Sequence, residues 1–232
     1  MPSNLLNSPL LGLVLTIVTF RIGEFLAKRL ETNLLQPFVT SSILIMLTIY
    51  LFPSITYKEY EIGGSIIAFL LGPATVALAL PLFKQWQLLK ENISILLGGA
   101  VVAATAGLLS IIACLKIFGA SEKVALSLIA KSVTAPIALE ITKTLGGLPS
   151  LTIACTVLSG ILGAIIGHKL LAILGVKNDV AIGMAMGAAS HGIGATSCIP
   201  ISAVQVAFCS LAIALVGITT ALFAPIFVKL LM

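Results

Sequence analysis

Charged side chains are scarce in this 232-residue sequence. Asp, Glu, Lys and Arg make up only 9% of it, against about 25% in soluble proteins, while apolar residues make up 59%. So few charges cannot cover the polar surface that a soluble domain of this size needs. The composition therefore excludes a soluble enzyme and a disordered chain. It also excludes a nucleic-acid-binding domain, because the thirteen Lys and Arg residues are scattered, with only Lys28 and Arg29 adjacent, and form no basic stripe.

Signatures of disulfides, metal sites and catalysis are lacking too. The four cysteines lie in apolar runs without a CxxC pair, which predicts reduced thiols buried as small hydrophobic groups: Cys114, Cys155, Cys198 and Cys209. His191 has no second His or carboxylate beside it, so it is a poor metal ligand, and no Ser-His-Asp arrangement accompanies it. We therefore predict no enzyme activity, no metal and no cofactor.

Long uncharged stretches dominate what remains. Residues 32–57, 62–83, 92–115 and 144–167 carry no charged side chain, and neither does the run 180–228. About 20 apolar residues cross a bilayer as a helix, and lipid offers no hydrogen-bond partner to an open strand edge. Together with the N-terminal stretch and residues 123–143, the pattern predicts an all-α integral membrane protein with about seven or eight membrane elements.

A weak internal repeat divides the chain. Residues 72–84 align without gaps with residues 131–143, and each copy precedes a Gly/Ala-rich helix and a Phe-Gly or Leu-Gly turn. Paired, interrupted segments in two halves are typical of membrane carriers. We predict one polytopic domain over 1–232, with N-terminal helices at 1–61, repeat-like units at 62–121 and 122–178, and a histidine motif and last helix at 179–232. Whether the repeats are inverted is open at this stage.

Glycine and proline interrupt three of the apolar stretches. Gly72-Pro73 lies in the first, Pro136 in the second, and a glycine-rich run around His191 in the third. Irregular backbone at membrane depth survives only inside protein or beside a water-filled cavity. The alternative is ordinary tolerance, since membrane helices contain Gly and Pro more often than soluble ones. Three breaks favour a binding site near the bilayer midplane, built from interrupted segments.

The second interrupted segment carries charge. Lys131 and Glu140 each cost about 2.5–3.5 kcal/mol inside an apolar stretch, so each needs a partner or a cavity. Ser132 and Thr134 add hydroxyls, and Pro136 frees the backbone carbonyl of Ser132. Two interpretations stay open for Lys131: it snorkels to the interface, or it faces an aqueous pocket as a cation.

The third interrupted segment surrounds a histidine. His191 follows Ser190 and precedes Gly192 and Gly194, whose backbone N–H groups can approach an anion closely. The imidazole is either a hydrogen-bonded structural group or one that contacts substrate and exchanges a proton. The predicted substrate-binding set is Lys131, Ser132, Thr134, Pro136, Ser190, His191, Gly192, Gly194, Gly72 and Thr75. His191 and Glu140 are the candidates for proton coupling.

Three strings, LGPATVAL, KSVTAPIA and ASHGIG, occur in this order at 71–78, 131–138 and 189–194. They resemble the LrgB/CidB family of antiholin-like bacterial membrane proteins over nearly the whole chain. The resemblance implies a multi-pass protein of the bacterial cytoplasmic membrane that modulates murein hydrolase activity and autolysis beside a small holin-like (LrgA-type) partner. Other relatives are associated with transport of glycolate, glycerate or pyruvate. The Arg and Glu that usually follow the histidine motif are absent here, at Ser197 and near Pro200.

The leading hypothesis is a carrier of small monocarboxylates, with autolysis control as the family-level role. The alternative is a non-transporting antiholin-like regulator that acts through the holin-like partner. Other predicted partners are the lipid bilayer and a second copy of the chain, but not nucleic acid. A carrier needs the polar residues around one wet cavity, whereas a regulator can place them against partner helices.

Overall fold

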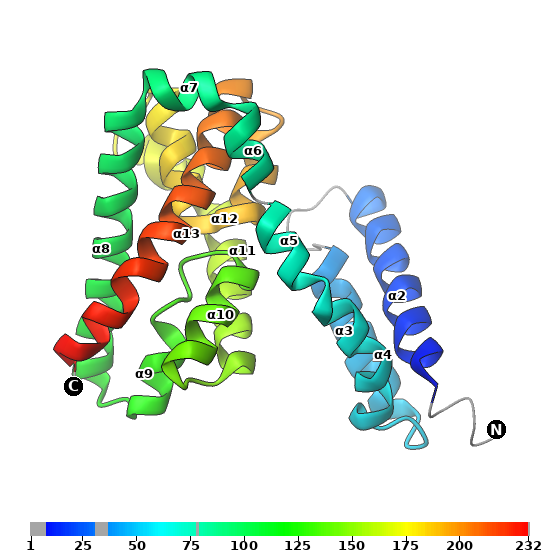
Figure 1. Cartoon of the computed structure of the whole chain (residues 1–232). Coiled ribbons are helices and arrows are strands. Elements are labelled where there is room, and N and C mark those ends of the chain that lie inside the picture. Colours follow the sequence, from blue (N-terminus) through cyan, green and yellow to red (C-terminus); the bar gives the residue numbers. More distant parts are fainter. Residues whose placement is uncertain (1–7, 31–36, 78, 232) are drawn as a thin grey trace. The chain divides into compact units, whose positions relative to one another are not determined.

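The computed structural model describes residues 8–30, 37–77 and 79–231, and helices are the only regular secondary structure in these ranges (Figure 1). Four of them have the length and apolar composition to cross a membrane: α2 (Pro9–Leu30), α8 (Ile93–Phe118), α11 (Pro149–Ile173) and α13 (Ala203–Leu231). A further apolar helix, α3 (Pro37–Leu51), is shorter. The chain is therefore an all-α, multi-pass membrane protein. The larger predicted number of membrane elements stays a prediction.

The chain divides into two compact units, residues 1–74 and 75–232. In the first unit α2 packs on α3 and on α4 (Tyr57–Phe69). Glycines bring α2 and α4 together, since a Cβ on Gly12 would lie only 2.3 Å from the carbonyl oxygen of Tyr60. A Cβ on Gly63 would lie 2.1 Å from the carbonyl oxygen of Pro9. Backbones that approach this closely need small residues, as is typical of helix contacts in lipid.

The first predicted interruption consists of short helices. After α4 the chain forms α5 (Leu71–Ala77), α6 (Ala79–Lys84) and α7 (Trp86–Glu91), with breaks at Leu70 and Gln85. Gly72 and Pro73 lie in the first turn of α5 and not at a break. Proline is tolerated there because a first-turn residue has no intrahelical partner for its nitrogen. The boundary between the two units falls inside α5.

The second predicted interruption is a hairpin. After α8 and the left-handed Gly119 (φ 62°), α9 (Glu122–Leu128) enters, residues 129–134 are not helical, and α10 (Ala135–Leu145) returns. The backbone N–H of Leu148 donates to the hydroxyl of Ser127 at 2.7 Å, and the Thr152 hydroxyl donates to the carbonyl of Ser127 at 2.7 Å. The chain therefore leaves this first hairpin, residues 122–145, beside the helix on which it entered.

The third predicted interruption is a hairpin as well. α12 (Asp179–Cys198) has 20 residues, which would span about 30 Å if the helix were straight. Yet Ser202 and Gln205, just beyond its end, donate to the carboxylate of Asp179 at its start, at 2.6 and 2.8 Å. The bend lies at His191, whose φ of 41° and ψ of −130° are not helical. α12 therefore forms a second hairpin, residues 179–198.

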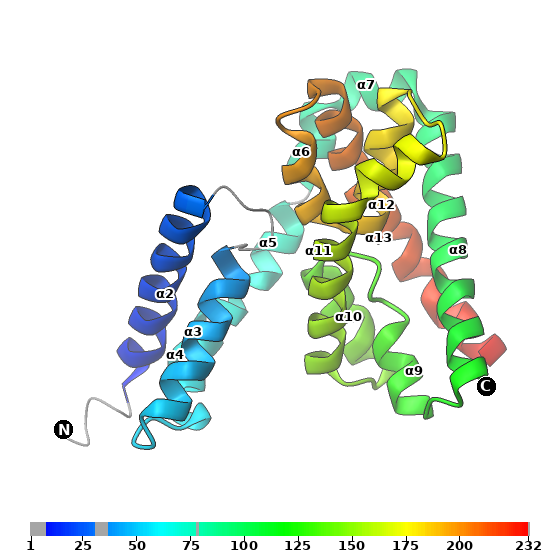
Figure 2. The ribbon, with the colours of Figure 1, turned by 180° about the vertical axis from the view of Figure 1, so that it is seen from behind.

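The two hairpins enter the second unit from opposite ends. In Figures 1 and 2, α9 and α10 lie at the end where α8 finishes, whereas both ends of α12 lie at the end where α11 finishes. α13 packs against α12, α8 and α10, and the core between them includes Leu108, Ile129, Val133 and Val216. The fold therefore directs the bends of both hairpins toward the interior of the unit.

All four thiols are free in the structure. Cys198 and Cys209 are buried as predicted, and Cys155 is half-buried. The prediction of burial is wrong for Cys114, which is exposed. Lipid solvates apolar groups as well as a protein core does, so a membrane helix can leave a small hydrophobic side chain on its outer face.

Candidate functional site

The bend of the first hairpin leaves a helix end without its usual cap. Thr134 is the N-cap residue of α10, in extended conformation, and Pro136 lies in the first turn. The side chain of Thr134 makes no capping hydrogen bond, and its Oγ1 atom is buried without a partner. The 11-residue α10 therefore presents an N-terminus with partial positive charge, uncapped by this side chain, inside the unit.

The bend of the second hairpin is strained. His191 is the one non-glycine residue with positive φ among the residues that the structure describes, and such a conformation costs about 1–3 kcal/mol. Its side chain is only 4% exposed. Strain of this kind persists where the surroundings impose it, and it gathers at functional sites.

Helix α11 makes room for this bend with small residues. A Cβ on Gly160 would lie 3.1 Å from Cε1 of His191, and a Cβ on Gly163 would lie 1.9 Å from Oγ of Ser190. Both glycines belong to the Gly/Ala-rich helix that follows the second copy of the repeat. Small residues of this helix therefore pack directly against the histidine motif.

The two bends meet. The imidazole of His191 lies beside the backbone of Lys131 and is close enough for the Lys131 charge to act on it. Ala188 also packs against the cluster that contains Ala130 and Val133. The structure thus brings together the second and third predicted segments. Their role in binding stays a prediction.

The part that Gly72 and Thr75 play in the site stays a prediction. Gly72 is exposed and belongs to the unit 1–74, and no atom lies within 4 Å of the position that its Cβ would take. The side chain of Thr75 lies outside the described residues.

Unpartnered polar atoms occur at both bends and on α11, which packs against the second bend. Five buried side-chain atoms in the described part of the chain have no hydrogen-bond partner. Four of them are Thr134 Oγ1, Ser190 Oγ, His191 Nε2 and Thr156 Oγ1, and the fifth is Oε1 of Gln85 at the start of α7. Thr156 lies one turn before Gly160 on α11, on the face that meets the histidine. An unsatisfied buried polar group costs about 1–3 kcal/mol, so such a cluster indicates a site for water or a polar ligand.

Lys131, whose backbone lies beside His191, also lines a cavity. Its ammonium lies 3.4 Å from the hydroxyl of Ser132, and it has no acidic partner within ion-pair distance among the described residues. The side chain lines a cavity of ≈ 380 Å³ between α8 and α9. Lys131 is half-buried, and both interpretations of it, a snorkelling lysine and a cation in an aqueous pocket, stay predictions.

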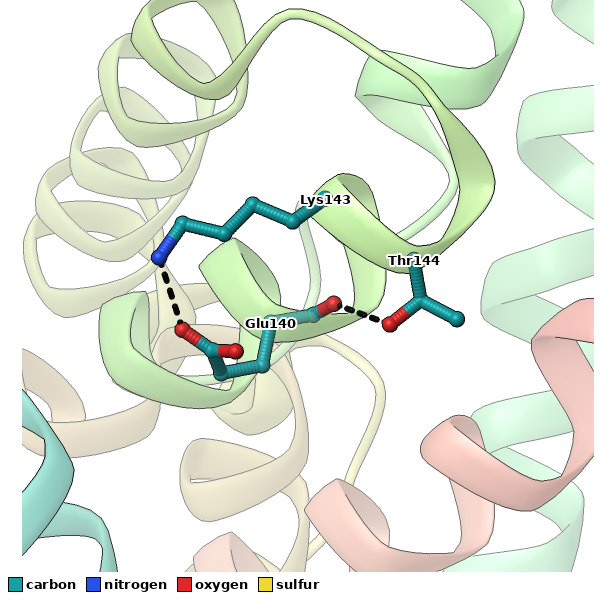
Figure 3. A network of polar contacts seen from close by, with 3 residues as sticks. All are labelled: Glu140, Lys143 and Thr144. Atoms are coloured by element: carbon teal, nitrogen blue, oxygen red, sulfur yellow. Dashed lines mark hydrogen bonds and ion pairs between the residues drawn. The ribbon is translucent and has the colours of Figure 1, made fainter.

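The other predicted residues have distinct positions. Glu140 is exposed and pairs with Lys143 at 2.9 Å, and the Thr144 hydroxyl donates to its backbone carbonyl at 2.8 Å (Figure 3). This carboxylate is therefore not one of the buried groups at the bends. Gly192 is exposed, whereas Gly194 is buried, and its Cβ would lie 2.5 Å from the carbonyl oxygen of Met186.

Sequence reasoning missed a polar network at the open end of the second hairpin. Gln205 is buried, donates to Asp179 at 2.8 Å, and its Oε1 lies 3.1 Å from Nε2 of His168. Hydrogen bonds from Ser202 and then Gln205 hold the pKa of Asp179 below its usual value. These residues come from distant points of the chain, so no spacing indicates them. Thr156 was missed too, although its place one turn before Gly160 could have suggested it.

Comparisons with known proteins agree with the sequence resemblance. Residues 16–230 match the model of the LrgB-like family. The chain is similar to the uncharacterized protein YxaC of Bacillus subtilis, with 34% identity over 218 residues and 94% of each chain covered. It is equally similar to an uncharacterized protein of Haemophilus influenzae, with 34% identity over 217 residues and 94% of each chain covered. No solved structure matches it.

Proposed function

The chain belongs to the LrgB-like family, and we propose that it carries small monocarboxylates across the bacterial cytoplasmic membrane. One observation carries this proposal: the four buried polar atoms without partners at the two bends and on α11, which belong to Thr134, Ser190, His191 and Thr156. They offer hydrogen bonds to a small polar ligand in a part of the protein that lipid and bulk water do not reach.

The arrangement of the second unit supports a carrier. A long helix, a left-handed glycine and an interrupted segment occur twice, with Gly119 at φ 62° and Gly175 at φ 75°. The first copy consists of α8, α9 and α10, and the second of α11 and α12. We infer an inverted repeat, because the two hairpins enter from opposite ends. In carriers of this kind the substrate lies between the interrupted helices, and the two halves rock to expose it alternately.

The chemistry at the bends suits a carboxylate. Lys131 supplies a positive charge without an acidic partner, and the N-terminus of α10 adds the partial charge of its dipole. The hydroxyls of Thr134 and Ser190 are free to donate to carboxylate oxygens. Since Ser197 stands where the family usually has an Arg, Lys131 is the cation that we assign to the substrate.

A matched pair of variants on α11 tests the site. Thr156→Val removes a hydroxyl that has no partner, so the variant should fold at least as well as the wild type but lose most of the uptake. Thr152→Val removes a hydroxyl that bonds the carbonyl of Ser127 at 2.7 Å and lies 2.9 Å from the hydroxyl of Thr142. This control should be less stable by about 1–3 kcal/mol, yet its folded fraction should transport normally.

The measurement is uptake of labelled small monocarboxylates by liposomes that contain only the purified chain. Normal uptake by well-folded Thr156→Val would remove the cluster at the bends from the transport path. If the wild type itself takes up no carboxylate, the carrier function is wrong. That result is the one expected for the alternative, a non-transporting antiholin-like regulator.

The remaining predictions of the resemblance concern partners. Modulation of murein hydrolase activity, a small holin-like partner and a homo-oligomer stay predictions. Because a carrier works without a holin-like protein, uptake by the purified chain alone separates transport from a role that depends on that partner.

A further inference from the structure

The second hairpin is joined to its neighbours by hydrogen bonds at its open end. Asp179 accepts from Ser202 at 2.6 Å and from Gln205 at 2.8 Å. Oε1 of Gln205 lies 3.1 Å from Nε2 of His168 on α11. We call these four residues the latch. The latch ties the start of α12 both to α11 and to the start of α13.

The rest of the hairpin has smoother contacts. A Cβ on Gly183 would lie 2.5 Å from the carbonyl oxygen of Gln205, and a Cβ on Gly187 would lie 2.4 Å from that of Cys209. Both carbonyls belong to α13, and small residues of α11 face the bend from the other side. Helices that touch through glycine do not interlock side chains as ridges and grooves do. These surfaces can therefore part without rotamer changes.

The bend has the properties of a hinge. His191 holds a strained φ of 41°, and its Nε2 atom has no partner that would fix it. The next residue, Gly192, is exposed, and no atom lies within 4 Å of the position that its Cβ would take. A hinge consists of a few residues that absorb a change in φ and ψ. Residues 191 and 192 can absorb such a change.

The first hairpin is tied in a different way. The backbone N–H of Leu148 donates to the Ser127 hydroxyl, and the Thr152 hydroxyl donates to the Ser127 carbonyl. Opening the first hairpin would break bonds of backbone groups, which need partners wherever water is absent. The latch joins side chains only, and three of its four residues are half-buried, so water can replace its bonds. The second hairpin is therefore the easier one to open.

Two exposed cations stand beside the latch. Lys169 follows His168 on α11, and Lys177 precedes Asp179 by two residues. Both ends of α12 lie at the end where α11 finishes (Figure 2). Positive charge at an entrance raises the local concentration of an anion. An anion that approaches from water on this side would therefore meet the latch first.

We propose that the second hairpin is the gate through which the substrate reaches the proposed site, hinged at residue 191 and held shut by the latch. When the latch breaks, its side chains bond to water, and the hairpin moves away from α11 and exposes the bend. This inference rests on the proposed function and assigns its entrance. Gln205 is a positioning residue, because it acts through Asp179 and His168 and not on the substrate.

A native thiol reports the opening. Cys198 is buried at the end of the hairpin, 3.9 Å from Nε2 of His168. Its reaction with a water-soluble maleimide is followed by peptide mass spectrometry on the purified chain in nanodiscs. Gln205→Leu removes a hydrogen bond to a charged carboxylate, so Cys198 should react at least about tenfold faster than in the wild type. Thr152→Val, which loosens the first hairpin instead, should leave the rate at Cys198 unchanged.

A reversible disulfide across the latch tests the gate in transport. Asp179→Cys with Ser202→Cys places two thiols where the native side chains bond at 2.6 Å. Oxidation by diamide should join them and stop uptake of labelled glycolate by liposomes, and dithiothreitol should restore it. Recovery after reduction shows that the oxidised protein was folded. The same treatment should not change uptake by the wild type.

The outcomes separate this inference from the proposed function. If the oxidised variant takes up glycolate as fast as the reduced one, the hairpin is not the gate, although the carrier function stands. If Gln205→Leu leaves the rate at Cys198 unchanged, or Thr152→Val raises it as much, the latch does not hold the hairpin shut. If the wild type takes up no carboxylate, the carrier and its gate fail together, and the rate at Cys198 still decides what the latch does.

Discussion

The backbone conformation at His191 predicts that glycine is more stable than alanine at this position, the reverse of their ordinary order in a helix. In a helix interior, glycine is less stable than alanine by about 0.8–1.0 kcal/mol. At residue 191 the φ of 41° lies in a region that a residue with a Cβ rarely adopts and that glycine adopts readily. We therefore expect His191→Gly to be more stable than His191→Ala.

The magnitude follows from the strain. Both variants delete the imidazole, so the lost contacts with α11 and with Lys131 nearly cancel in the comparison. What remains is the cost of a Cβ at this φ, about 1–3 kcal/mol. His191→Gly should exceed His191→Ala by that amount in free energy of unfolding.

The assay compares the midpoints of chemical or thermal unfolding of the variants in one detergent. Ala189→Gly is the matched control, because Ala189 is exposed and helical in the same element. This change should destabilise the protein by about 1 kcal/mol, in the ordinary direction. Compared with alanine at the same position, glycine should thus stabilise the protein at residue 191 and destabilise it at residue 189.

One result would refute the reasoning. If His191→Ala is as stable as His191→Gly, or more stable, residue 191 does not hold a left-handed conformation. The bend of α12 and the second hairpin would then lack their physical basis. Transport is a separate readout, and both variants should lose it because neither has an imidazole.

Three further predictions concern the same region. Gly163→Ala should displace Ser190, whose Oγ would lie 1.9 Å from the new Cβ, and cost about 1–3 kcal/mol and most of the uptake. Gly98→Ala, with no atom within 4 Å, should be neutral or stabilising in the same unfolding and uptake assays. His191→Gln should keep substrate binding but remove the pH dependence of uptake and accumulation driven by a proton gradient; full proton-driven accumulation would make the histidine structural. Because hydrogen bonds from Ser202 and Gln205 lower the pKa of Asp179 from its ordinary 3.8, their stabilisation is complete above that pH and lost as the pH falls through the lowered value. Hydrogen exchange in α12 should accelerate in that acid range for the wild type, and a similar acid response in Asp179→Asn would exclude the carboxylate as its cause.

The sequence by itself determined the class of protein and two of the three predicted places where its helices are interrupted, around Pro136 and around His191. Composition alone decides membrane insertion, because the transfer of apolar side chains into lipid does not depend on their tertiary neighbours. Interruption is also local. Pro136 cannot continue a helix from the residues before it, because it has no N–H to donate to the carbonyl of Ser132, and the glycines around residue 191 weaken a helix. The glycines at 119 and 175 allow the left-handed turns that end α8 and follow α11.

Only the tertiary structure decided the direction of the chain after each interruption and the chemical surroundings of its residues. A break permits a bend, but the return of α12 depends on hydrogen bonds that join Asp179 to Ser202 and Gln205. Gly72-Pro73 shows the opposite outcome, since it has the same local signal and lies inside a helix. Long-range packing likewise puts the unpartnered hydroxyl of Thr156 on the face of α11 that meets His191. It also places the side chain of Lys131 beside residues of α8 and α9. No local pattern encodes these contacts, because the residues that make them are brought together only when the helices pack.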